Sequence, residues 1–146
     1  MADMTGYSRK EKAAAVSASM SPHLFTLLTI FIPLSSSISA FVTGVLLYAA
    51  GLTGFVVAVV SYSKTLPETH SAHGVYKISR NPMYVTALMV YTGITVMTLN
   101  GLLAVLLIIM ILLHHMMIKA EERACSKRFG KQYKQYMENT PRYLLL

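Results

Sequence analysis

The sequence predicts an all-α integral membrane protein with about four transmembrane helices in two hairpins and a cytoplasmic C-terminal helical extension. All 13 Lys and Arg and all 6 Asp and Glu fall in three segments, residues 3–12, 64–80 and 119–142. The two segments between them, 13–63 and 81–118, carry none of these residues. A membrane-spanning helix needs about 20 apolar residues, so each uncharged segment can hold two spans. The composition agrees, because only 13% of residues are charged, whereas soluble proteins average about 25%.

The three charged segments are expected on one side of the membrane, because two crossings return the chain to the side from which it started. Lys and Arg favour the cytoplasmic side of short loops. The net charge of +7 therefore predicts that both termini and any site formed by the charged segments are cytoplasmic. Nucleic-acid binding is disfavoured, because the basic residues border apolar spans and form no separate domain.

In the first hairpin, residues 5–20 suit a short helix lying at the membrane interface. Ser21 and Pro22 predict the start of the first span, because Ser caps helices and Pro is tolerated in the first turn. Pro33 and the serines at 35–37 predict the turn on the far side. The second span is then expected to end near Ser63.

Small residues recur four positions apart in the predicted second span, at Ala40 and Gly44 and again at Ala50 and Gly54. This spacing lets helices approach closely in lipid and permits a homodimer. The ordinary composition of membrane helices explains the pattern equally well.

The second hairpin begins at Asn81 and Pro82, because Asn can cap a helix and Pro at the first position loses no helical hydrogen bond. The third span is expected to run to about Leu99. Asn100 and Gly101 predict a turn there, because both residues tolerate a positive φ.

The fourth span is expected over residues 102–118, and the helix should continue into the cytoplasm because no helix breaker precedes Gly130. In that extension Phe129, Tyr133 and Tyr136 fall at i, i+4 and i+7, on one side of a helix. This spacing most often indicates packing or an interfacial anchor rather than direct ligand contact.

Two polar patches flank the second hairpin, residues 73–84 before it and residues 114–122 after it, and the hairpin should bring them together. The first patch offers Arg80 beside a helix N-terminus, which attracts carboxylate or phosphate groups. The second offers the carboxylates of Glu121 and Glu122, which suit an ammonium, a sulfonium or ribose hydroxyls. A ligand with one anionic and one cationic end would match the pair.

Simpler interpretations of the same residues remain open. Arg80 and Lys77 could be positive flanks of a span, and the acidic pair at 121–122 could offset the neighbouring basic residues. His114 and His115 share helix faces with the two glutamates, and we predict packing roles for these histidines and no metal. A proton-coupled transporter is disfavoured, because neither uncharged segment contains a carboxylate.

Several motifs occur in a fixed order around the second hairpin. They are Gly74-x-Tyr76, Arg80-Asn81-Pro82-x-Tyr84, Glu121-Glu122, Phe129-Gly130-x-x-Tyr133-x-x-Tyr136 and Pro141-Arg142. In this order, residues 64–143 resemble the integral membrane methyltransferases of the isoprenylcysteine carboxyl methyltransferase and phospholipid (phosphatidylethanolamine) N-methyltransferase family.

The resemblance implies S-adenosylmethionine as methyl donor, held between the cytoplasmic ends of the last two spans and the C-terminal segment. As catalytic residues we expect Arg80, which would orient the acceptor headgroup or the cofactor carboxylate, and Glu121, which would bind the cofactor with Glu122 in support. The residues that we expect around the cofactor are His73, Gly74, Tyr76, Arg80, Asn81, Pro82, Tyr84, Glu121 and Glu122. The chain would be a single methyltransferase domain, with an interfacial helix and first hairpin over residues 1–63 and a cofactor-binding loop, second hairpin and C-terminal segment over 64–146.

The acceptor stays open, because the motifs fall between subfamilies. Isoprenylcysteine enzymes and many bacterial relatives carry His where this chain has Asn81, whereas phosphatidylethanolamine enzymes carry Asn-Pro-Met-Tyr but lack the tail seen at Phe129 to Tyr136. The implied acceptor is membrane-soluble, either a lipid amine or an isoprenylcysteine-like carboxylate or thiol. The alternatives are a non-catalytic membrane scaffold with the shape of the family and a small four-span transporter.

Overall fold

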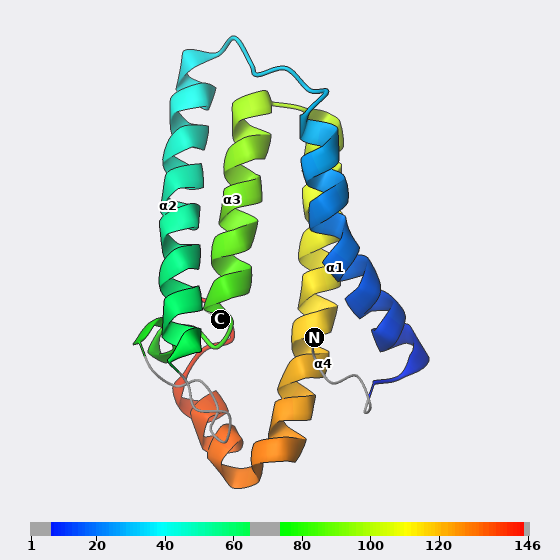
Figure 1. Cartoon of the computed structure of the whole chain (residues 1–146), viewed down its shortest axis with the longest axis vertical. Helices are drawn as coiled ribbons and strands as arrows, with labels where there is room; N and C mark the ends of the chain where they lie inside the picture. The colour runs from blue at the N-terminus through cyan, green and yellow to red at the C-terminus, as the bar shows by residue number, and fades with distance from the viewer. Residues whose placement is uncertain (1–6, 65–73, 145–146) are drawn as a thin grey trace.

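Four α-helices make up almost all of the computed structural model, which describes residues 7–64 and 74–144. They are α1 (Arg9–Thr29), α2 (Ile38–Ser63), α3 (Pro82–Thr98) and α4 (Gly101–Asn139), with a short 3₁₀ helix, η1 (Gly74–Lys77), before α3. The helices run along the long axis of the molecule, with α2 packed on α3 and α1 packed on α4 (Figure 1). The prediction of an all-α chain built from four long helices is confirmed.

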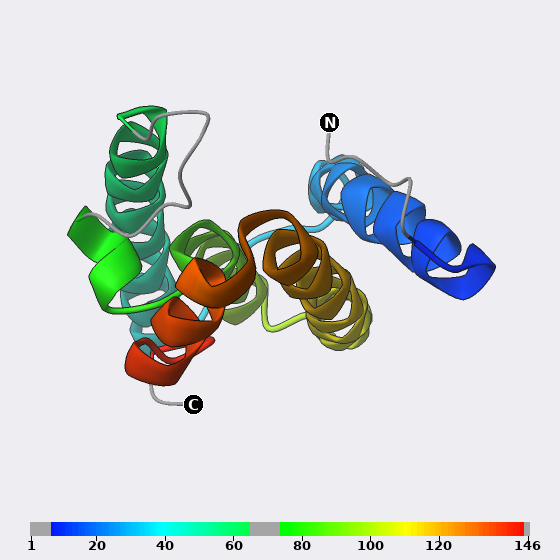
Figure 2. The same ribbon diagram turned by 90° about the horizontal axis from the view of Figure 1, so that it is seen from below.

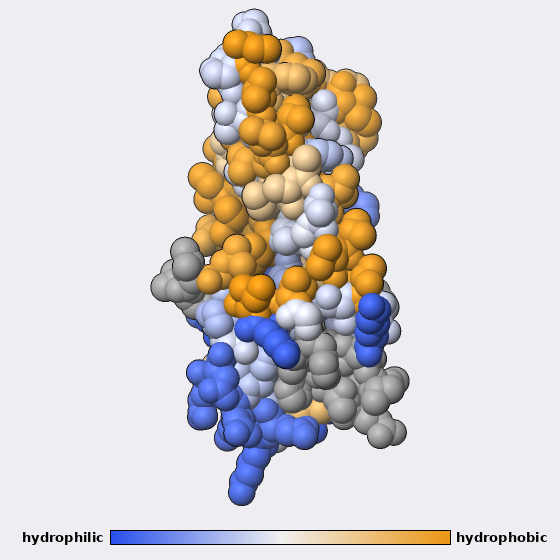
Figure 3. Space-filling model, turned by 90° about the vertical axis from the view of Figure 1, so that its left-hand side faces the viewer, coloured by the Kyte–Doolittle hydropathy of each residue, from blue (hydrophilic) through white to orange (hydrophobic). Residues whose placement is uncertain are grey.

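The charged segments gather at one end of the molecule. The α1–α2 and α3–α4 connections lie at the upper end in Figure 1, and the start of α1, the end of α2 and the C-terminal part of α4 lie towards the lower end. A space-filling view shows hydrophilic residues collected at that lower end and apolar residues along the body above it (Figure 3). The described parts of the three charged segments are therefore neighbours in space, as the hairpin prediction requires.

Two of the described helices, α2 and α4, are long and apolar enough to cross a membrane, and α3 is a shorter apolar helix of 17 residues. Seventeen residues of helix extend about 25 Å, slightly less than the roughly 30 Å of a bilayer core. Length and composition alone would be weak evidence, because buried helices of soluble proteins can share these properties. Here, however, side chains such as Leu46 and Leu112 are 66% and 61% exposed, as expected for helices that face lipid.

The predicted helix start at Ser21 and Pro22 is wrong. One continuous helix, α1, includes the segment expected at the interface and passes through Pro22. Proline cannot donate a hydrogen bond to the carbonyl four residues earlier, and here the Ser21 hydroxyl donates to the Ala18 carbonyl at 2.9 Å instead. The helix begins where Ser8 and Glu11 form a reciprocal capping box, a stronger start signal than Ser21-Pro22.

Glycine lets α2 and α3 approach until their backbones touch. A Cβ placed on Gly93 would lie 2.6 Å from the Tyr48 nitrogen and 2.7 Å from the Gly44 carbonyl oxygen. A Cβ on Gly51 would lie 2.8 Å from the Val90 nitrogen. Small residues of α2 therefore allow close approach within one chain, and the homodimer stays a prediction.

A core of apolar side chains joins α1, α3 and α4. Phe25, Leu103, Leu107 and Met110 are buried together. Phe25 also meets the Tyr91 ring edge-on at a centroid distance of 5.0 Å. The α4 members recur at the 3.6-residue period of a helix, so α4 presents one buried stripe to the rest of the fold.

The second hairpin turns where predicted, but the positive φ lies at Leu99 (48°) rather than at Asn100 or Gly101. Asn100 instead caps α4, because its side-chain oxygen accepts from the Leu102 and Leu103 nitrogens. The long α4 then continues beyond the apolar stretch to a kink at Gly130, where φ is 56° and ψ is −127°. Seen from below, the chain after this kink turns back beneath α3 towards η1 (Figure 2).

Candidate active site

Three segments far apart in sequence meet at the start of α3: residues 79–84, the part of α4 around Glu121 and Glu122, and the C-terminal segment, defined here as residues 140–144. The backbone N–H of Arg80 donates to the Pro141 backbone carbonyl at 3.0 Å. The Ser79 hydroxyl and the side-chain amide of Asn81 both donate to the Arg142 backbone carbonyl at 3.2 Å. These bonds hold the C-terminal segment against the first turn of α3.

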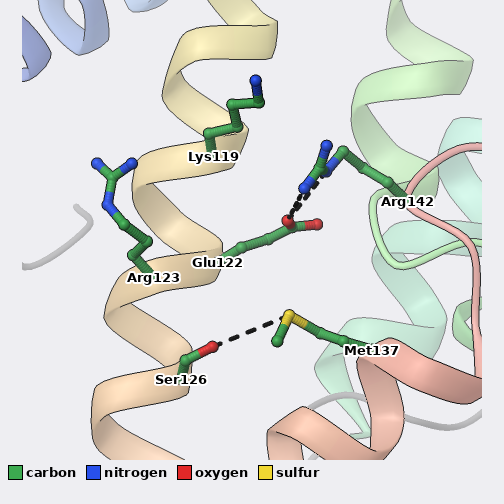
Figure 4. Close-up of a pocket in the computed structure, with 6 residues that line it drawn as sticks. All are labelled: Lys119, Glu122, Arg123, Ser126, Met137 and Arg142. Carbon is green, nitrogen blue, oxygen red and sulfur yellow. Dashed lines mark hydrogen bonds and ion pairs between the residues drawn. The ribbon is translucent and has the colours of Figure 1, made fainter.

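Glu122 lies at the centre of this junction, with only 6% of its side chain exposed. Arg142 donates to its Oε2 atom from Nη2 at 2.8 Å and from Nε at 2.9 Å (Figure 4). On the other oxygen, Oε1, the Asn81 amide donates at 3.3 Å and the Arg80 Nε lies at 3.5 Å. One carboxylate therefore faces two guanidinium groups, which leaves a surplus positive charge.

The buried side chain of Arg80 is not fully satisfied by this arrangement. It is 9% exposed, and its Nε atom has no hydrogen-bond partner among the described residues. A buried donor without a partner costs about 1–3 kcal/mol, so a ligand that supplies an acceptor at this point would be favoured.

Asn81 precedes α3 as predicted, but its side chain makes no capping hydrogen bond. The amide group instead joins Glu122 to the C-terminal segment. Capping is needed less here because Pro82, at the first helical position, has no N–H group.

Glu121 turns towards α3 rather than towards the arginines. The Tyr84 hydroxyl lies 3.0 and 2.9 Å from its two carboxylate oxygens and donates to them. Burial raises the pKa of the Glu121 carboxyl, and the hydrogen bond from Tyr84 partly opposes that rise. No cation pairs with Glu121 among the described residues, so its carboxylate is available to a cationic ligand.

The Gly74-x-Tyr76 motif packs η1 against neighbouring helices. Gly74 has a φ of +58°, and a Cβ there would lie 2.8 Å from the Ser61 hydroxyl of α2. The Tyr76 carbonyl accepts from the Tyr136 hydroxyl at 2.6 Å, and burial raises the pKa of the Tyr76 phenol to about 12. Tyr136 is thus a packing residue, as predicted, while His73 lies outside the described residues.

Both histidines of α4 are hydrogen-bonded within the protein. His114 Nδ1 lies 2.8 Å from the Met110 carbonyl oxygen, and its ring packs edge-on to Tyr84. His115 Nδ1 lies 2.7 Å from the Tyr143 hydroxyl, which adds another contact to the C-terminal segment. Over residues 7–64 and 74–144, no group of three or more His, Cys, Asp or Glu side chains is placed to hold a metal.

Arg142 is the main member of the junction that sequence reasoning did not select. In the sequence it belongs to the Pro141-Arg142 motif, and no local spacing connects it with Glu122. The hydrogen bond to Glu122 raises the pKa of its guanidinium, so Arg142 stays charged. The chain must turn at Gly130 before the two residues can meet, and that turn is visible only in three dimensions.

Comparison with known proteins gives one match. No curated protein and no solved structure matches the chain. The sequence matches the model of the phospholipid methyltransferase family over residues 42–132, which include nearly all of α2, then η1, α3 and α4 beyond its kink. This match covers more than half of the chain and starts earlier than the resemblance noted from the motifs. The chain therefore belongs to the phospholipid methyltransferase family.

Proposed function

We propose that this protein transfers a methyl group from S-adenosylmethionine to an amine of a membrane phospholipid at the cytoplasmic edge of the bilayer. Family membership implies methyltransferase activity and S-adenosylmethionine as donor. The observation that carries the assignment of the site is the half-buried carboxylate of Glu121, which pairs with no cation among the described residues and lies beside the Arg80–Glu122–Arg142 cluster. The gathering of charge at one end supports four crossings with both termini cytoplasmic.

The described residues fit such a cofactor. S-adenosylmethionine carries a carboxylate, an ammonium and a sulfonium, and it supplies an electrophilic methyl group. The Nε of Arg80, which makes no hydrogen bond to a described residue, suits the carboxylate, and Glu121 suits a cationic group. The remaining predicted cofactor residues, from Gly74 to Tyr84, lie on η1 and the first turn of α3 beside this junction.

The chain's own residues would act mainly by positioning, which can lower a barrier by several kcal/mol when the reacting groups are aligned. Glu122 and Asn81 fix the start of α3, and Tyr84 fixes the direction of the Glu121 carboxylate. An ammonium acceptor must lose a proton before its nitrogen can be methylated. The raised pKa of Glu121 brings its carboxylate closer to the neutral range in which a general base works best.

Replacing Glu121 should abolish most of the activity. In Glu121→Gln the side chain keeps its size but loses its charge and basicity, so we expect transfer of labelled methyl into phosphatidylethanolamine to fall at least about 100-fold. Arg80→Gln, which removes the guanidinium group and its free donor capacity at Nε, should lower activity in the same assay. Both are measured on purified protein in phospholipid vesicles.

Matched controls for these variants lie on exposed positions. Glu138→Gln on α4 and Lys77→Gln on η1 change charge equally but lie outside the junction, and both should retain wild-type activity. Full activity in folded Glu121→Gln and Arg80→Gln would refute the assigned roles. If calorimetry in detergent detects no S-adenosylmethionine binding by the wild type, the protein is instead a scaffold with the shape of the family.

The pH dependence should report the Tyr84–Glu121 hydrogen bond. Because burial raises the pKa of Glu121, activity should decline on the acid side at a pH above the ordinary carboxyl pKa of 4.5. Tyr84→Phe removes the hydrogen bond that lowers this pKa, so the acid limb should move to still higher pH. A pH–rate profile of the two proteins measures the shift, and movement towards lower pH would contradict the arrangement.

A further inference from the structure

A basic pocket opens beside the junction, on the face of α4 that carries Lys119, Glu122, Arg123 and Ser126. Its volume is about 290 Å³, and Met137 and Arg142 line it from the opposite side. Figure 4 shows Lys119 and Glu122 on the side of α4 that faces Arg142, whereas the Arg123 guanidinium turns away. Arg123 pairs with Glu11 on α1, so its charge is already compensated.

The remaining charges do not balance. Glu122 is shared by Arg80 and Arg142, and Lys119 is exposed without an ion-pair partner among the described residues. Among the residues that line the pocket, the two cations Lys119 and Arg142 therefore face one carboxylate, which leaves the pocket with a charge of about +1. The Ser126 hydroxyl, which lies 3.9 Å from the Met137 sulfur, is a further donor at the wall.

These properties favour a small anion over the proposed methyl donor. S-adenosylmethionine carries a net positive charge, which a positive pocket disfavours. A volume of about 290 Å³ also lies at the lower limit for a ligand of that size, whereas a phosphodiester is far smaller. Lys119 and Glu121 lie roughly 160° apart around α4, so the pocket opens on a different face from the carboxylate assigned to the reaction.

The level of the pocket along α4 points to a lipid headgroup. Lys119 directly follows the uncharged stretch 102–118, which places its ammonium at the boundary between hydrocarbon and headgroups. The phosphate groups of a bilayer lie at this depth, and basic residues there attract anionic lipids. We infer that Lys119 and Arg142 form a binding site for the phosphodiester of an anionic phospholipid, separate from the acceptor site.

Lipid binding tests this site without relying on methyl transfer. The full-length protein in detergent is titrated with phosphatidylglycerol or with zwitterionic phosphatidylcholine, and retained lipid is measured by native mass spectrometry. Lys119→Gln should lower the affinity for phosphatidylglycerol roughly fivefold, with phosphatidylcholine unaffected. Lys119→Arg should retain the affinity, because it keeps the charge.

The control is Lys127→Gln, an exposed position on α4 outside the pocket, which should bind phosphatidylglycerol like the wild type. An equal loss in Lys127→Gln would overturn the inference, because it would show diffuse attraction rather than a site. Unchanged binding in Lys119→Gln would overturn it directly. Displacement of the lipid by an equal concentration of inorganic phosphate would assign the pocket to free phosphate instead.

Discussion

Glu122→Ala should destabilise the protein by about 3 kcal/mol, because removing one partner of a buried ion pair leaves the opposite charge uncompensated. Glu122 is the shared acceptor of Arg80, Arg142 and Asn81. Without it, two guanidinium groups repel each other and the Asn81 amide loses one acceptor. The loss is measured as a change in the free energy of unfolding during chemical denaturation in detergent micelles.

Two further variants separate charge from packing at this position. Glu122→Gln keeps the volume and one acceptor oxygen, so it should be destabilised less than the alanine variant. Glu138→Ala removes an exposed carboxylate from the same helix and should change stability by no more than about 0.5 kcal/mol. Equal stability of Glu122→Ala and Glu138→Ala would mean that the junction contributes nothing to the fold.

Gly93→Ala should cost about 3 kcal/mol, at the upper end of the range for overpacked sites. The added methyl group would meet backbone atoms of α2, at 2.6 Å from the Tyr48 nitrogen and 2.7 Å from the Gly44 oxygen. Backbone cannot rotate away as a side chain can, so α2 and α3 must separate. Because α3 carries Tyr84 and follows Arg80, the displacement should also lower methyl transfer.

Gly101→Ala is the matched control, because a Cβ at Gly101 meets no atom within 4 Å. It also replaces glycine in a helix by a better helix former, so stability should stay constant or rise by up to about 1 kcal/mol. Thermal denaturation of both variants in one detergent makes the comparison. If Gly93→Ala is as stable as Gly101→Ala, α2 and α3 do not pack as closely as the structure indicates.

Much of the fold could be predicted because membrane insertion depends on local composition. The absence of charge over 81–118 and the Asn100-Gly101 pair are enough to place the second hairpin and to bring Arg80 near Glu121 and Glu122. The helix start predicted at Ser21 and Pro22 was wrong, because Pro22 can either begin a helix or be accommodated within one. In the structure the Ser21 hydroxyl donates to the Ala18 carbonyl, which Pro22 leaves without its usual donor.

The sequence alone determines the all-α fold class, the position of the second hairpin and the motif residues at its ends. It does so because charge and hydropathy act on each segment separately. The tertiary structure decided which partner each of those residues contacts. Glu121 turns to Tyr84, whereas Glu122 turns to Arg80 and to Arg142. Adjacent residues of a helix point about 100° apart, and which neighbour each one meets depends on how α3 and the C-terminal segment pack around α4. That packing follows from the kink at Gly130 and the glycine contact between α2 and α3, and the sequence positions of these glycines do not say which elements they bring together.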